Sequence, residues 1–165
     1  VPFAIPVIFN AESSGEKKAT LGEEYRIFTH PSRGFSVEYP QELIIEVYTE
    51  EDEGETLVFR PPESRENIAE KVGFQIYGIP FGEEIISRER ILRDIPDKAI
   101  LELQTVTLNP TAEPPVRGLL FWSESPEIGK TREVWFAHNE YLYAITTYAH
   151  LDLWLAKILS TWRFE

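Results

Sequence analysis

The chain of 165 residues contains neither cysteine nor methionine. The lack of cysteine excludes thiol catalysis, disulfides, zinc ribbons and iron–sulfur clusters, which all need thiol or thiolate groups. The lack of methionine extends to position 1, and a cleaved signal peptide or a shortened chain would account for it. We expect a signal or anchor sequence to be missing from this chain, and an extracytoplasmic location in the periplasm, at the cell surface or in a lumen.

Basic residues are also few, because 16 lysines and arginines face 28 aspartates and glutamates, for a formal charge of -12. Nucleic-acid binding depends largely on lysine and arginine, so the excess of acidic residues excludes a nucleic-acid binder. The same negative charge disfavours binding to an anionic membrane surface. Long apolar runs are missing too. The longest covers residues 1–9 and holds two prolines, well short of the roughly 18 apolar residues that cross a bilayer. We expect no nucleic-acid partner and no membrane insertion.

The remaining composition is that of a folded domain, with 42% hydrophobic and 13% aromatic residues. A chain of this length can bury a substantial core, and two full domains would be small. Residues 1–24 are interpreted as an apolar segment plus a polar linker. Residues 25–165 are interpreted as one domain.

Short runs of alternating apolar and polar residues predict strands throughout this domain. They lie at residues 25–30, 35–40, 43–48, 56–60, 72–79, 99–108, 118–124, 131–137 and 141–149. A short turn at 138–140 predicts the clearest hairpin, and the last residues, 161–165, predict a short closing strand. Helical periodicity appears at 83–95 and 150–160. This order predicts an α+β fold with a mostly antiparallel sheet packed between helices.

Two stretches carry a resemblance to a known family. The first is YRIFTHPSRGFSVEYPQEL, with its aromatic strand, its turn and the pattern GFS-x-x-YP. The second is REVWFAHNEYLYAITTYAHLDLWLAKILSTWRFE at the end of the chain. Together they resemble the opening and closing segments of PsbP-like domains and bracket about 140 residues.

The resemblance implies an α/β/α sandwich around an antiparallel sheet, and a role without catalysis. PsbP-like proteins act as extrinsic subunits or assembly helpers of photosystem II on the lumenal side. Related bacterial domains are exported proteins of unknown role, and a fold relative binds the small GTPase Ran. Because one fold serves several functions, the resemblance favours a generic exported domain.

Residues that could carry chemistry are sparse. His30, His138 and His150 lack the spacing of a metal site and are interpreted as surface or capping residues. His150 and Asp152 lie two positions apart on a predicted helix and point in different directions, so they cannot pair as in a hydrolase. No catalytic residue and no cofactor are expected.

Two weaker candidates for binding remain. Glu51, Asp52 and Glu53 belong to an acidic hairpin tip whose carboxylates could hold Ca²⁺, although such tips are usually just solvated. Tyr141 and Tyr143 lie on one side of a strand and could contact a partner, although most of the neighbouring aromatic residues are expected in the core.

These observations favour a non-enzymatic exported domain that acts as a protein-binding or assembly module, with another protein as its partner. The alternative is a small-ligand or calcium-binding envelope protein that uses the acidic hairpin or an aromatic cleft. A second alternative is an unrecognised hydrolase.

Overall fold

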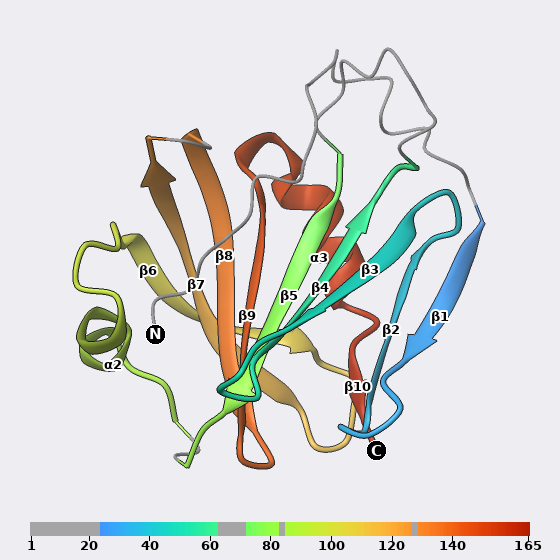
Figure 1. Ribbon diagram of the computed structural model, residues 1–165, viewed down its shortest axis with the longest axis horizontal. Coiled ribbons are helices and arrows are strands. Elements are labelled where there is room, and N and C mark those ends of the chain that lie inside the picture. The colour runs from blue at the N-terminus through green and yellow to red at the C-terminus, as the bar shows by residue number, and fades with distance from the viewer. Residues whose placement is uncertain (1–23, 63–71, 83–84, 127–128) are drawn as a thin grey trace.

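The computed structural model describes residues 24–62, 72–82, 85–126 and 129–165 (Figure 1). Of these residues, 53% lie in strands and 14% in helices, and they form a sheet of seven strands, a sheet of three strands and two short helices. The predicted α/β/α sandwich is therefore wrong, and the described chain has a mostly β fold. The predicted segment 1–24 lies outside the described residues, except for Glu24.

Neighbouring strands are antiparallel in both sheets. The small sheet has the order β1 (Tyr25–Thr29), β2 (Phe35–Pro40) and β10 (Arg163–Phe164). The large sheet has the order β3 (Ile44–Thr49), β4 (Glu55–Arg60), β5 (Phe74–Pro80), β9 (Tyr141–Tyr148), β8 (Gly129–His138), β7 (Val116–Ser125) and β6 (Leu101–Asn109). The antiparallel pairing and the short closing strand agree with the sequence prediction.

The helices are shorter than their periodicity suggests. Helix α2 (Arg88–Asp94) begins late because the Ser87 hydroxyl accepts a hydrogen bond from the Arg90 amide at 3.1 Å and caps the helix there. The second predicted helix begins as a 3₁₀ turn, η1 (Ala149–Leu151), and continues as α3 (Asp152–Leu159). Among the described residues, no helix is long and apolar enough to cross a bilayer.

The hairpin predicted at 138–140 is confirmed. Its two-residue loop places Asn139 at φ 51° and Glu140 at φ 68°, and the flanking His138 and Tyr141 pair across the ladder. Consecutive residues in the left-handed region match the twist of antiparallel strands. This tight turn fixes the register of β8 against β9.

Strand β9 is buried on both of its faces. Tyr143 and Ile145 point into a core shared with α3, whereas Leu142 and Ala144 point into a second core shared with α2. Because side chains alternate along a strand, the apolar run of β9 supplies both cores at once. The strand therefore needs a cover on each side of the sheet.

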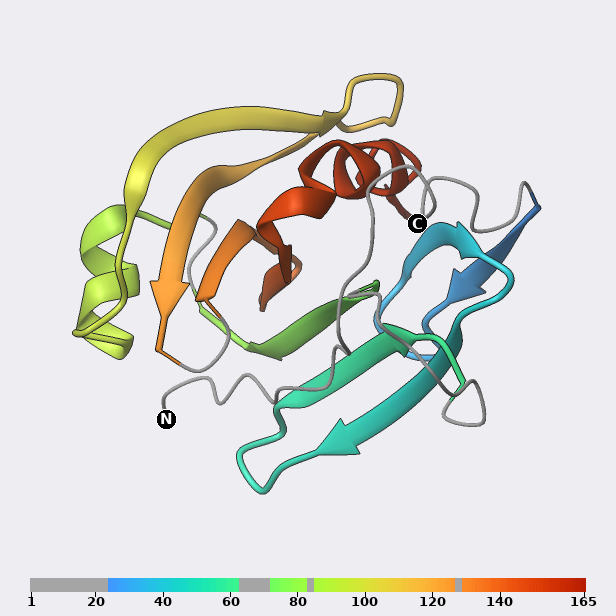
Figure 2. The ribbon, with the colours of Figure 1, turned by 90° about the horizontal axis from the view of Figure 1, so that it is seen from above.

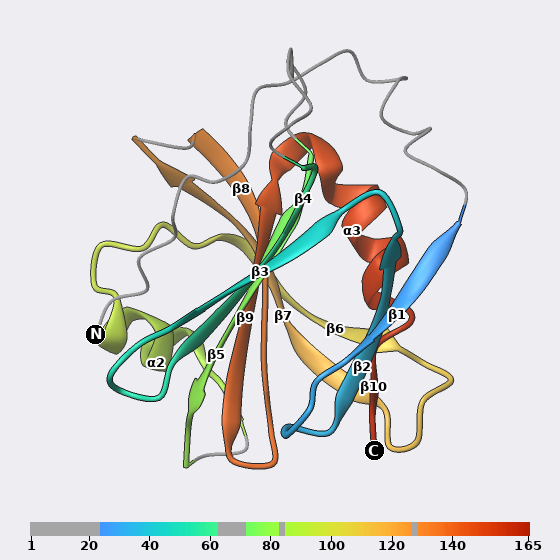
Figure 3. The ribbon, with the colours of Figure 1, turned by 45° about the vertical axis from the view of Figure 1, so that its right-hand side comes forward.

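The large sheet meets this need by curving. Figure 2 shows β6 and β7 bending over one side of α3, while β4 and β5 pass on the other side. The small sheet closes the remaining side, with β2 and β10 beside α3 in Figure 3. Trp162, just before β10, is fully buried and stacks on Phe35 of β2 at 4.4 Å between ring centroids. The main core thus lies inside the curved sheet.

The opposite face of the sheet holds a buried carboxylate. Glu133 is only 1% exposed and accepts hydrogen bonds from Thr131, Trp135 and Thr146 at 2.9–3.1 Å. The Lys98 ammonium, from the connection between α2 and β6, lies 3.3 Å from the same carboxylate. A buried charge is tolerated only when it is paired and hydrogen-bonded, so this ion pair anchors the connection to the sheet.

Two buried tyrosines of the large sheet have raised pKa values. Burial raises the pKa of Tyr143 to about 12, an effect that the positive charge of Arg33 partly opposes. Burial and the nearby charges of Asp52 and Glu50 raise the pKa of Tyr77 to about 12 as well. Both phenols therefore stay protonated in the fold at pH values where an unfolded chain would lose those protons.

The first prediction concerns the Lys98–Glu133 pair. Replacing Lys98→Met should lower the free energy of unfolding by about 3 kcal/mol, because Glu133 would stay buried without its cation. The double variant with Glu133→Gln should recover much of this loss, since an amide carries no charge. Lys130→Met is the control: Lys130 is exposed and lies over a tryptophan ring. This control variant should lower the free energy of unfolding by at most about 1 kcal/mol. Urea unfolding measures all three; a double variant no more stable than Lys98→Met would show that the pair is not coupled.

The second prediction concerns alkaline pH. Because the pKa of Tyr143 rises from an ordinary 10.0 to about 12 in the fold, its contribution to stability is present below pH 10 and is lost as the pH rises through 12. The Tyr143 hydroxyl has no hydrogen-bond partner among the described residues. Tyr143→Phe should therefore raise the free energy of unfolding at pH 7 by up to about 1 kcal/mol, and flatten its fall above pH 10. Urea unfolding of the wild type and of Tyr143→Phe, at pH 7 and above pH 10, tests this prediction. A lower free energy of unfolding for Tyr143→Phe at pH 7 would contradict it.

Candidate functional site

A pocket of about 230 Å³ lies between helix α3 and strands β6, β7 and β8, inside the curve of the large sheet. One of its walls is the edge strand β6, which pairs irregularly with β7: the register shifts between Leu101 and Gln104 and again between Thr107 and Asn109. Such irregularities bend a strand away from regular pairing. The pocket is lined by Val106, Thr107, Leu108, Leu120, Arg132, Val134, Asp152, Leu155, Ala156 and Leu159.

Most of the pocket wall is apolar. Val106 and Leu120 face it from the sheet, and Leu155 and Leu159 face it from the buried side of α3. Ala156 is exposed on the helix and also lines the pocket, so it marks the side open to solvent. Concave, largely apolar surfaces with a few polar groups are typical of small-molecule sites.

One end of the pocket is polar, and Arg132 dominates it. Its side chain points to the inner face of β8, in phase with Val134, and the residue is only 7% exposed. The Arg132 Nε donates to Asp152 Oδ1 at 2.9 Å, and the guanidinium carbon lies 3.9 Å from the centre of the Trp122 ring. Its Nη1 is buried and has no hydrogen-bond partner among the described residues. The site therefore offers an unused, charged donor at the edge of an apolar cavity.

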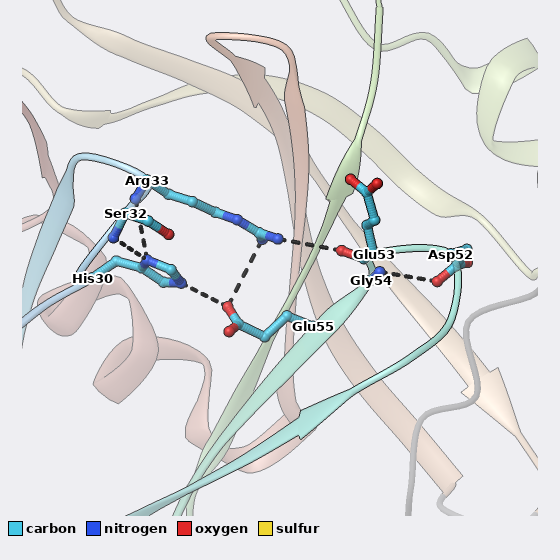
Figure 4. A network of polar contacts seen from close by, with 7 residues as sticks. All are labelled: His30, Ser32, Arg33, Asp52, Glu53, Gly54 and Glu55. Atoms are coloured by element: carbon cyan, nitrogen blue, oxygen red, sulfur yellow. Dashed lines mark hydrogen bonds and ion pairs between the residues drawn. The ribbon is translucent and has the colours of Figure 1, made fainter.

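A second polar cluster joins the two sheets, as Figure 4 shows. His30 follows β1 of the small sheet, and Glu55 begins β4 of the large sheet; His30 Nε2 lies 2.7 Å from Glu55 Oε1. Arg33 Nη1 lies 3.8 Å from the same oxygen, and Arg33 Nη2 donates to the Glu53 carbonyl at 3.3 Å. These contacts bring together residues that lie between 20 and 25 positions apart in the sequence.

The hydrogen bonds of His30 fix its tautomer. Its Nδ1 accepts from the amides of Ser32 and Arg33 at 3.1 and 3.2 Å, so Nε2 carries the proton and donates it to Glu55. Both ring nitrogens are thus engaged, and neither offers a lone pair for a base or a metal. The geometry is that of a structural clasp. His30 was expected to be a surface or capping residue; it is buried, and its Nδ1 caps the turn that follows β1.

The acidic hairpin tip is a tight turn. Asp52 Oδ1 accepts from the Gly54 amide at 2.9 Å, and Glu53 adopts φ 69° while its carbonyl accepts from Arg33. Glu51 is exposed. In the described part of the chain, no group of three or more histidine, aspartate or glutamate side chains is arranged to hold a metal ion.

The two candidate tyrosines lie in different environments. Tyr143 is 1% exposed and contacts Phe35, Phe136 and Trp162 in the main core. Tyr141 is half-buried, and the Arg33 guanidinium lies 4.2 Å from the centre of its ring. Of the pair, only Tyr141 has a surface that solvent reaches appreciably.

The remaining residues considered in the sequence, His138, His150 and Asp152, do not come together in one site. His138 stacks on Phe164 at 3.7 Å between ring centroids, while His150 is exposed in η1. Asp152 lies at the start of α3, inside the predicted helical segment, and its partner is Arg132, which was not among the residues singled out from the sequence. A signal was present, because a charged residue two positions before Val134 falls on the inward side of an alternating strand.

Comparisons with known proteins give a fold likeness only. No family model matches the chain, and no curated protein matches it. A crystal structure of an uncharacterised protein from Bacteroides thetaiotaomicron is similar, with a TM-score of 0.50 and 12% sequence identity. The likeness covers 85% of this chain and 48% of the Bacteroides chain, so this chain spans about half the length of the Bacteroides protein. The resemblance to PsbP-like domains stays a prediction.

Proposed function

We propose that this protein is a non-enzymatic, extracytoplasmic domain that binds a small, largely apolar molecule in the pocket between α3 and strands β6–β8. The observation that carries the proposal is the pocket itself, a cavity of about 230 Å³ whose walls are apolar except for Thr107 and the Arg132–Asp152 ion pair. Burial of apolar ligand surface drives binding to such a cavity.

The size of the pocket sets the size of its ligand. A protein cavity of about 150 Å³ accepts benzene, which has six heavy atoms. By the same proportion, about 230 Å³ accommodates a molecule of about nine heavy atoms. A short alkyl chain or a single substituted aromatic ring fits this limit, whereas a sugar chain or a nucleotide does not.

The polar clusters support a role without catalysis. Both nitrogens of His30 are used in the clasp between the sheets, and the Glu133 carboxylate is surrounded by three hydrogen-bond donors and the Lys98 ammonium. General bases need a free lone pair within reach of a substrate. These two groups instead hold elements of the fold together.

A second candidate function is the binding of another protein through strand β3. This strand ends the large sheet among the described strands, and it exposes Ile44, Val47 and Tyr48, by 38%, 55% and 46%. An edge strand with unpaired backbone groups and apolar side chains can add an extended segment of a partner. This second candidate corresponds to the protein-binding or assembly module that the sequence favours.

Occupation of the pocket is tested with a neutral apolar probe, 1-octanol. Ala156→Trp would place a large side chain at the open side of the pocket and should weaken octanol binding at least about tenfold. Leu153→Trp adds the same side chain to α3 at an exposed position outside the pocket lining and should leave binding unchanged. Isothermal titration calorimetry measures both; equal binding by Ala156→Trp and the wild type would contradict the proposal.

The β3 candidate is tested separately with Val47→Lys, which places a charge on the exposed edge. Capture of a partner from the envelope fraction of the native host should be lost in this variant, because edge lysines oppose strand addition. Octanol binding should persist. A partner captured equally by both chains would contradict a β3 interface.

A further inference from the structure

We propose that the pocket binds a monocarboxylate, and that Arg132 recognises its carboxylate group. This inference rests on the proposed function and adds the chemical class of the ligand. It starts from the one feature of the pocket that apolar packing does not explain, a guanidinium at its edge that is nine-tenths buried and only partly hydrogen-bonded.

The unpartnered donor belongs to a residue that lines the pocket. Several buried polar atoms of the described residues lack hydrogen-bond partners, but Arg132 is the only such residue among those that line the cavity. A buried polar group without a partner costs about 1–3 kcal/mol, and a charged group costs more. A ligand that supplies an acceptor at Nη1 would remove this cost.

The chemistry of the guanidinium favours a carboxylate as that acceptor. Asp152 uses only the Nε side of the fork, through one oxygen at 2.9 Å, and remains about one-third exposed. The Nη side can still bind an anion, and guanidinium groups match carboxylate geometry. Charge-assisted hydrogen bonds are roughly twice as strong as neutral ones, so an ionised acid is preferred over an alcohol of the same size.

The rest of the ligand is set by the walls. A carboxylate held by Arg132 would extend its body along Val134 and Leu120 toward Leu155 and Leu159. Both a straight alkyl chain and a phenylalkyl group suit an apolar cavity of this volume. The shared chemistry is a short apolar body with one terminal carboxylate, and the experiment separates the two forms of the body.

The experiment measures binding of heptanoate, phenylacetate and 1-octanol, each of about nine heavy atoms, to the full chain at pH 7.5 by isothermal titration calorimetry. The wild type should bind at least one of the two acids about tenfold more tightly than octanol. The tighter of the two identifies the alkyl or the aromatic form. Arg132→Met should remove this preference for the acid while octanol still binds.

Asp152→Asn provides a second variant that keeps the guanidinium. It removes the competing carboxylate, so the preference of the pocket for the acid over octanol should be equal or greater. If octanol binds the wild type as tightly as both acids, the carboxylate inference is overturned while the apolar pocket stands. If none of the three compounds binds at millimolar concentration, the proposed function fails together with it.

Discussion

The burial of strand β9 on both of its faces is the constraint on which the rest of the structure depends. Tyr143 and Ile145 need a cover on one side of the sheet, and Leu142 and Ala144 need one on the other. The covers available are small, since α2 has seven residues and α3 has eight. The sheet therefore curves around α3, and the small sheet closes the side that remains open (Figure 2). Curvature supplies the area that longer helices would supply in a sandwich.

The pocket is a consequence of the same curvature. Strand β6 bends over α3, and its register shifts against β7 are irregularities that allow a strand to bend. The bent strand packs less closely on the helix. Arg132 lies in phase with the apolar residues of β8 and so must point toward the space under the helix. The beginning of α3 places Asp152 within 2.9 Å of it, a position where a negative charge also suits the helix dipole. One ion pair thus forms the polar end of a largely apolar cavity.

Local features of this fold could be predicted from the sequence, and their assembly could not. The alternation of residues indicated the strands, and the hairpin at 138–140 was placed correctly. The α/β/α sandwich was wrong because periodicity shows which faces are apolar, not how far a sheet will curve or how short its helices will be. His30 was expected to be a surface or capping residue, and it does cap its turn. Its burial could not be predicted, because its partner Glu55 lies 25 residues away and no local pattern links them. Tyr141 and Tyr143 share a side of one strand, yet the neighbours that bury Tyr143 come from β2 and from the end of the chain.

The two proposed binding surfaces lie at opposite edges of the large sheet, with the pocket beside β6 and the exposed apolar strand at β3. Five strands separate these edges, so a substitution at one has no direct contact with the other, and the two functions can be separated by mutation. A ligand in the pocket would add contacts between α3 and the edge strand β6. Because such a ligand binds only the folded chain, its binding energy stabilises the curved arrangement itself. The cavity therefore lies where added contacts bear most directly on the curvature that holds β9 buried.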